Sequence, residues 1–456
     1  MATLIKEHSP EHDGGNGAVE LVGARTNERI NDLFGPRLAV LNSKAPIFAG
    51  IGLVLCVLGL VLSPKTFFQS YLFAFMFWFG ITIGSMAFLM LHHVTGGGWG
   101  FILRRPMEAA TRCWPFVLGM FVPLVIAMFL SMPDGHVGLY EWADSKIVSS
   151  DKILTSKAGY LNPLGWLIRA GIYFTIWFTL THFLNKWSRD EDTSDDPRVR
   201  HRLSLLSSWG LIAFVLTTTF ATIDWVMTLE PHWFSSLWGA IFLVGQAHAT
   251  LCIMIVLLRH LGHDLPLIKN IEKRYFRDIG NLMLAFTLLW AYTNYSQFMI
   301  MYSANIAEEA EWYVHRTTFG WQYFGLFLII LHFVLPFLFL LMSLTKVNIY
   351  NLARLATFLI VVRHIDLFFY VVPTFRQTPL SGTPIPGLPG NLSPFAFLAD
   401  FGVPLLLGGI WLWSWSGQMR KANAPIVPQF DERLEGFWPL PEADEKFTRK
   451  EVHAHG

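Results

Sequence analysis

Ten long apolar runs dominate this sequence and limit what it can fold into. A helix needs about 20 mostly apolar residues to cross a bilayer. Runs of about that length lie at 45–63, 68–91, 113–130, 164–183, 203–223, 237–258, 282–302, 324–344, 352–372 and 395–415. Lipid offers no hydrogen-bond partner for backbone N–H and C=O groups, so such spans must be helices packed as a bundle. We therefore predict an all-α integral membrane protein with ten transmembrane helices.

The composition supports this fold class. Charged residues make up 15% of the chain and hydrophobic residues 53%, whereas soluble domains carry about 25% charged residues. A soluble globular enzyme and a disordered chain are both excluded. The net charge of +1 gives no electrostatic reason to expect a nucleic-acid partner.

The positions of Lys and Arg predict the orientation of the bundle. If the N-terminus, the even-numbered loops and the C-terminus share one side, that side carries 26 of the 34 Lys and Arg residues and the other side carries 6. Both termini should therefore be cytoplasmic. We expect a polar cytoplasmic segment at 1–44, a membrane domain at 45–415 and a cytoplasmic tail at 416–456.

The cysteines give no sign of a metal centre. Cys56, Cys113 and Cys252 all lie in apolar runs, and the sequence contains no CxxC. We therefore expect no intrinsic iron–sulfur cluster, structural zinc or attached c-type haem. Buried thiols that pack as small apolar residues are the simpler interpretation.

Several polar residues lie inside the apolar runs, where ionisable groups are costly and are functional candidates by default. His248 is near the middle of its run, and Arg363, His364 and Asp366 lie in the outer half of another. Arg169, Tyr295, Gln297 and His332 also lie inside runs, and Asp224 directly follows the run at 203–223 at its outer end. Most lie at or outside the membrane midplane, so they could line one hydrated cavity.

Plainer interpretations stay open for each of these residues. His248 and His332 could be hydrogen-bonded core histidines. Arg363 and Asp366, three residues apart, could simply neutralise each other. Asp224 could stabilise a turn at the headgroups. Axial ligation of a haem b by two of the three span histidines is disfavoured, because the outer halves of the spans lack a matching second pair.

The loops and prolines give further expectations. Kinks are expected at Pro115, Pro123, Pro336 and Pro404. The stretch 186–202 should be a solvated inner connection, and the proline-rich stretch 373–394 an extended outer loop. Asn305 and Glu308 have the spacing of a capping box, which predicts a short interfacial helix after the seventh run.

Three strings carry a family resemblance: HHVTGGGWG at 92–100, DWVMTLEPHWF at 224–234 and SQFMIMYSANIAEEAEWYVHR at 296–316. Together with ten spans, they resemble the ActF-type membrane subunits of bacterial alternative complex III, within the broader NrfD-like family. The resemblance covers roughly 45–415.

The resemblance implies two four-helix bundles, spans 2–5 and 6–9, flanked by spans 1 and 10. It implies a multi-pass subunit of the bacterial inner membrane, in a quinol:cytochrome c (or equivalent high-potential acceptor) oxidoreductase. Expected partners are iron–sulfur and c-type haem subunits on the outer side, a paralogous NrfD-like subunit, small membrane subunits and lipids. The chain is not expected to be an enzyme on its own. Quinone or quinol is the one redox molecule it would contact.

Depth and side-chain chemistry suggest roles for the polar residues. Asp224 and Asp366 would release protons outward, and His248 would relay them at the midplane. A quinone or water cavity would be lined by Tyr295, Gln297, Arg169, Arg363 and His364. The resembling strings supply residues that would dock partner subunits: Glu230, His232, Glu308, Glu309, Glu311, His315 and Arg316. His92 and His93 could take up protons inside, or the glycines beside them could make a tight turn.

Two other functions stay open. A stand-alone proton-coupled transporter would show paired, interrupted half-helices, and we find no such pair. A purely structural subunit would tolerate replacement of its buried polar residues.

Overall fold

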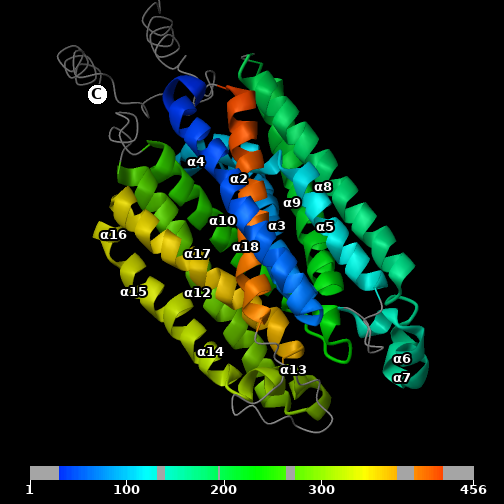
Figure 1. The fold of residues 1–456 in the computed structure, drawn as a ribbon. Helices are drawn as coiled ribbons and strands as arrows, with labels where there is room; N and C mark the ends of the chain where they lie inside the picture. The colour runs from blue at the N-terminus through cyan, green and yellow to red at the C-terminus, as the bar shows by residue number, and fades with distance from the viewer. Residues whose placement is uncertain (1–29, 131–138, 194–195, 263–272, 377–394, 425–456) are drawn as a thin grey trace, which may run out of the picture.

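The computed structural model describes residues 30–130, 139–193, 196–262, 273–376 and 395–424. Throughout these residues the regular structure is helical, and long helices run side by side as one bundle (Figure 1). This confirms the prediction of a helical membrane protein.

Eight helical segments are long and apolar enough to cross a membrane within the described part of the chain. They are formed by α2 (Ile30–Leu62), α3 (Pro64–Thr95), α8 (Pro163–Glu191), α9 (Pro197–Trp225), α10 (Trp238–Gly262), α14 (Trp321–Leu328) with its continuation to Leu341, α17 (Ile349–Val371) and α18 (Ala396–Ala422). Each contains one of the predicted apolar runs or most of it.

The two remaining runs fall on other helices. The run at 113–130 forms α5 (Trp114–Phe129), which follows α4 (Gly98–Thr111) at a bend of 49°. Counted together, this pair would make a ninth span. The run at 282–302 lies within α12 (Lys273–Ala304), a helix of 32 residues. It is too polar to satisfy the hydropathy criterion met by the others.

Short elements gather at the end of the bundle opposite the start of α2 (Figure 1). They include η1 (Glu141–Ala143), α6 (Ser145–Ser150), α7 (Lys152–Lys157), η2 (Met227–Leu229), α13 (Ala307–Thr317) and η4 (Val372–Thr374). α13 is the short helix predicted after the seventh run. Its N-cap is Ile306 and makes no side-chain capping bond, so the predicted Asn305 capping box is wrong. Asn305 instead adopts a left-handed conformation, with φ of 49°, where α12 ends.

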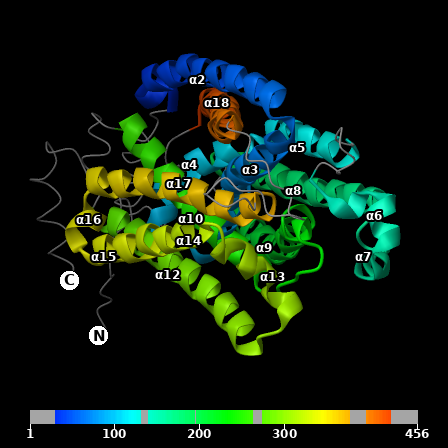
Figure 2. The same ribbon diagram turned by 60° about the horizontal axis from the view of Figure 1, so that its bottom comes forward.

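The first and last described helices, α2 and α18, pack along each other on one flank of the bundle (Figure 2). Glycines allow this approach: a Cβ on Gly52 would lie 2.3 Å from the Leu406 backbone nitrogen, and one on Gly409 would lie 2.5 Å from that of Ala49. Small residues at such contacts are typical of membrane helix pairs. The Ile30 backbone N–H donates to Ala424 O at 3.2 Å. The start of α2 and the end of α18 therefore lie together.

The core lies around α3. Of the residues in the most apolar stretch of this helix, 94% are buried. α3 contacts α4, α5, α9, α10, α17 and α18. Positive φ angles at Gly96 (68°) and Gly97 (106°) turn the chain from α3 into α4. The glycine-rich string at 92–100 therefore makes the tight turn that was one of its two interpretations, and His92 is buried beside it.

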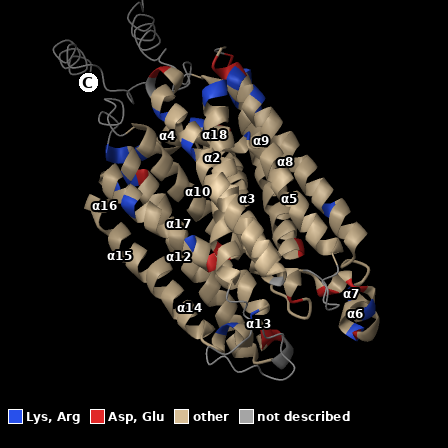
Figure 3. Cartoon of the chain, viewed as in Figure 1, with Lys and Arg blue, Asp and Glu red and all other residues tan. Residues whose placement is uncertain are grey.

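Lys and Arg gather at the end where α2 begins and α18 ends, while the middle of the bundle carries few charges (Figure 3). The connection at 186–202 belongs to this end. It is less solvated than predicted, because α8 continues to Glu191, and Glu191 and Asp192 are buried. Of the proline-rich stretch, residues 377–394 lie outside the described residues.

Candidate functional site

A cluster of buried polar side chains lies among α10, α12, α17 and η3, a π-helix at Ile329–Val334. Its centre is the carboxylate of Asp366 on α17. Arg363 Nη1, one turn earlier, donates to Asp366 Oδ2, and Trp290 Nε1 of α12 donates to the same oxygen at 3.1 Å. His332 Nδ1 lies 3.7 Å from that oxygen. Three helical segments thus converge on one carboxylate oxygen.

His248 of α10 extends the cluster away from Asp366. Its ring stacks on that of His332, with 5.6 Å between the centroids and 15° between the planes. Its Nε2 lies 3.3 Å from Thr287 Oγ1. Asp366, His332, His248 and Thr287 therefore follow one another as neighbouring polar groups in buried protein.

A glycine provides the space for this arrangement. A Cβ on Gly245 of α10 would lie 2.3 Å from Arg363 Cζ. The guanidinium occupies the place that a side chain would otherwise fill, so the Arg363–Asp366 pair depends on glycine at this position.

The π-helix sets the position of His332. Pro336 lies two residues beyond η3, and proline has no N–H to donate to the carbonyl of residue 332. A π-bulge accommodates the missing bond. The kink predicted at Pro336 thus has a structural counterpart that carries a cluster residue.

Several buried polar atoms of the cluster have no hydrogen-bond partner within the described residues. They are Nη2 of Arg363 and both ring nitrogens of His332. Each such group costs about 1–3 kcal/mol when left unpaired. The cluster therefore favours water or another polar occupant that can donate and accept hydrogen bonds.

The residues predicted to line one cavity are divided among separate places. His364 is buried against Phe77, with 3.8 Å between ring centroids. Gln297 accepts a hydrogen bond from Ser235 Oγ at 2.5 Å. Tyr295 is 63% exposed on the outer face of α12. Because Tyr295 does not face Arg363 or His364, these residues do not fit together as one binding site for a quinone head group.

Asp224 forms a second buried site between α8 and α9. Arg169 binds its carboxylate through two nitrogens, Nε to Oδ2 at 2.9 Å and Nη2 to Oδ1 at 3.0 Å. Tyr173 OH donates to Oδ2 at 2.9 Å. Arg169 is therefore the partner of Asp224, just as Arg363 is the partner of Asp366, and neither arginine pairs with His248.

Glu230 and Arg316 form a third buried pair, at the end of the bundle where α13 lies. Arg316 Nη1 donates to Glu230 Oε1 at 2.8 Å. It also reaches the end of α17, where Nη2 donates to Tyr370 O at 2.7 Å. The side chains of Glu230 and Arg316 are 8% and 2% exposed, so they join α13 to this chain's own core.

The pKa of Glu230 reflects this pairing. Burial alone would raise it, but the charge of Arg316 and hydrogen bonds from His315, Thr374 and Arg316 lower the pKa from 4.5 to about 2. The carboxylate is therefore ionised at neutral pH and holds its cationic partner in place.

The other predicted docking residues lie nearer the surface. His232 Nε2 contacts Asp151 Oδ2 at 2.6 Å, and this bond lowers the pKa of Asp151. Glu311 is exposed, Glu309 and His315 are partly buried, and the side chain of Glu308 lies outside the described residues.

The sequence analysis missed two charged groups. Arg376 donates to both carboxylate oxygens of Asp400, at 2.8 and 2.9 Å, and joins α18 to α3 through Ser70. Asp400 lies inside the tenth apolar run, so the criterion that selected Asp366 would also have selected it.

The second group that was not predicted joins the middle of α4 to the end of α8. Arg104 Nε and Nη2 contact Glu108 and Glu191 at 3.0 and 2.6 Å, and Arg105 Nη2 contacts Asp192 at 2.5 Å. Arg104 and Glu108 are four residues apart, and this spacing could have predicted an ion pair on one face of a helix.

The predicted thiol state is confirmed: Cys56, Cys113 and Cys252 are buried and free. Within the described residues, no three His, Cys, Asp or Glu side chains come together as a metal site.

Comparison of the chain with protein-family models and with curated protein sequences finds no match to either.

Proposed function

We propose that this chain is an integral membrane subunit of a quinol-oxidising respiratory complex, in which its buried Asp366 cluster carries protons. The complex would be a quinol:cytochrome c (or equivalent high-potential acceptor) oxidoreductase of the bacterial inner membrane. The resemblance to ActF-type subunits supplies the class. The convergence of Arg363, Trp290 and His332 on Asp366 is the observation that carries the proton role.

The topology belongs to the same proposal. Ten crossings would be the eight apolar spans, the bent α4–α5 pair and α12. A helix of the length of α12 extends about 48 Å at 1.5 Å per residue, which exceeds the hydrocarbon core. Ten crossings leave both termini on one side, and the excess of Lys and Arg there favours the cytoplasm.

The proton path would run along the three neighbouring groups of the cluster. A proton on His248 would pass to His332 and then to the carboxylate of Asp366, and each donor would return to its earlier charge. The 3.7 Å between His332 and Asp366 is longer than a hydrogen bond. A small ring rotation or a bridging water would complete this contact. A bridging water would also have to join the ring nitrogens of His248 and His332, because the two rings stack face to face.

No quinone step is assigned to this chain. Quinol would give up its electrons at sites that involve the partner subunits, because the predicted head-group residues do not converge in this chain. Asp224, bound by Arg169 near the outer surface, stays a second candidate for outward release.

A structural subunit is the competing function. Its support is that Asp224, Asp366 and Asp400 are each bound by an arginine of the same chain. Paired charges of this kind fix the packing of helices without any transport.

Asp366→Asn tests the choice, with Asp400→Asn as the matched control that also breaks an Arg–Asp pair. In complexes purified through this chain, Asp366→Asn should lower quinol turnover or proton release at least ~10-fold, as expected for loss of a proton-transfer group. Asp400→Asn should leave both near wild type in the assembled complex. Equal, unchanged proton release in both variants would exclude the relay and leave the structural role.

A further inference from the structure

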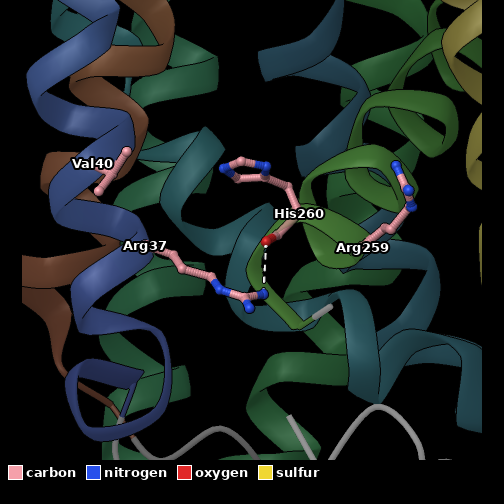
Figure 4. A pocket seen from close by; sticks show the side chains of 4 residues that line it. All are labelled: Arg37, Val40, Arg259 and His260. Atoms are coloured by element: carbon pink, nitrogen blue, oxygen red, sulfur yellow. Dashed lines mark hydrogen bonds between the residues drawn. The ribbon is translucent and has the colours of Figure 1, made fainter. Parts of the chain in front are cut away.

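A basic groove lies at the inner end of the bundle, between α2 and the last turn of α10. It has a volume of about 390 Å³ and is lined by Arg37, Val40, Arg259 and His260. Figure 4 shows Arg37 extending from α2 to the end of α10. There its Nη1 donates to His260 O at 3.1 Å and to Leu261 O at 2.9 Å. These bonds hold the groove's two walls together.

The charge of the groove is positive. Arg37, Lys44 and Arg259 all lie close enough to act electrostatically on His260. Arg259 Nε is buried and has no hydrogen-bond partner among the residues that the structure describes. The carbonyls at the C-terminus of α10 would repel an anion, but Arg37 already binds two of them. The remaining excess of positive charge favours an anionic group.

An apolar stripe leads away from these charges along α2. Arg37, Val40, Lys44, Ile47, Ile51 and Val54 follow one another at intervals of three or four residues. This spacing places them on one face of the helix. Val40, Ile47, Ile51 and Val54 are each 47% to 60% exposed. The stripe is therefore charged at Arg37 and Lys44, and beyond Lys44 it is apolar for about 10 Å, from Ile47 to Val54.

We propose that this groove binds the phosphate of an anionic phospholipid of the inner leaflet, with an acyl chain along the Val40–Val54 stripe. The phosphate would lie among Arg37, Lys44, Arg259 and the ring of His260. A free phosphate ion would share the cationic contacts but would gain nothing from the apolar stripe. Basic pockets on the cytoplasmic side of membrane proteins bind lipid head groups in this way. The proposal does not depend on the respiratory function.

The test is native mass spectrometry of the full chain in mild detergent. Phosphatidylglycerol and phosphatidylcholine with identical acyl chains are added in turn, and their dissociation constants are compared. The variant is Lys44→Gln with Arg259→Gln, which leaves the Arg37 bridge to α10 in place. The matched control is Lys273→Gln with Arg277→Gln, which removes the same charge from exposed positions on α12.

Wild type should bind phosphatidylglycerol more tightly than phosphatidylcholine, and the double variant should lose roughly 25-fold of that preference, about fivefold per cation. The control should keep the preference, and melting temperatures check that all three proteins are folded. Equal binding of both lipids by wild type would overturn the proposal. So would a preference that survives in the groove variant. Tight binding of inorganic phosphate without lipid preference would assign the groove to the free ion instead.

Discussion

At the scale of single residues, the central feature is a charge pair buried in apolar surroundings. Removing one partner of such a pair costs about 3–5 kcal/mol, because the other charge stays buried. Arg363 and Asp366 lie one turn apart on α17, but the pair is completed by Trp290 and His332 from other helices. The sequence alone could suggest the pair and not its partners.

The Gly245→Ala variant tests how tightly this pair is built. Its new Cβ would overlap the Arg363 guanidinium, so the arginine must move away from Asp366. We expect a loss of about 1–3 kcal/mol in stability, as in other overpacked cores. It would appear as a lower melting temperature in detergent.

Gly119→Ala is the control for that variant, because a Cβ there meets no atom within 4 Å. It should leave stability unchanged or raise it by up to ~1 kcal/mol through helix propensity. If both variants melt at the same temperature as wild type, the absence of a side chain at Gly245 is not what makes room for the Arg363 guanidinium.

The low pKa of Glu230 predicts a pH-dependent contribution to stability. The pKa is lowered from 4.5 to about 2 in the folded protein. The stabilisation is therefore complete above about pH 4.5 and is lost as the pH falls toward 2. Glu230→Gln should lower the melting temperature at pH 7, and its difference from wild type should shrink between pH 5 and pH 3.

Glu311→Gln is the control for this experiment, because Glu311 is exposed on the neighbouring helix α13. It should change the melting temperature little at any of these pH values. A Glu230→Gln deficit that stays constant down to pH 3 would mean that the carboxylate is not stabilised in its ionised form.

At the scale of helices, Pro336 and the π-helix before it determine where His332 lies. Pro336→Ala restores a backbone donor, so η3 can return to regular α-helix and His332 can turn away from Asp366. We expect turnover of the complex to fall while its melting temperature stays equal or rises. Unchanged turnover together with higher stability would show that the π-helix plays no role in the turnover of the complex.

Helices were also where the sequence was most informative. All ten apolar runs coincide with helical segments, because apolar runs of that length leave little choice in lipid. The boundaries were less predictable. α2 is already helical at Ile30, the first described residue of the chain, whereas its apolar run begins near 45. Ile30, Phe34 and Leu38 bury one face of this otherwise polar stretch. α4 was not predicted, because its Arg104, Arg105 and Glu108 are typical of a solvent-exposed segment until their buried partners are known.

At the scale of the whole molecule, the position of each polar residue along its helix was predictable from the sequence, but the direction in which its side chain points was not. Asp224, which directly follows its run, and Asp366, which lies inside one, belong to different sites. Tyr295 and Gln297 lie two residues apart on α12 and point to different surroundings, one exposed and one buried. Rotation about the helix axis depends on neighbouring helices, which a single sequence does not show.

The proposed orientation can be tested by cysteine labelling. Ser149, in α6, and Thr193, after α8, are exposed at opposite ends of α8, and the three native cysteines are buried. Ser149→Cys should react with an impermeant maleimide in intact cells. Thr193→Cys should react only after the membrane is opened. The reverse pattern would invert the topology.

The most direct test of the respiratory assignment is to purify this chain by affinity tag from native membranes in mild detergent and identify its partners by mass spectrometry. We predict stoichiometric recovery of iron–sulfur and c-type haem proteins, with quinol oxidation activity in the same fraction. Recovery of the chain alone across several gentle detergents, without redox proteins, would contradict the respiratory assignment.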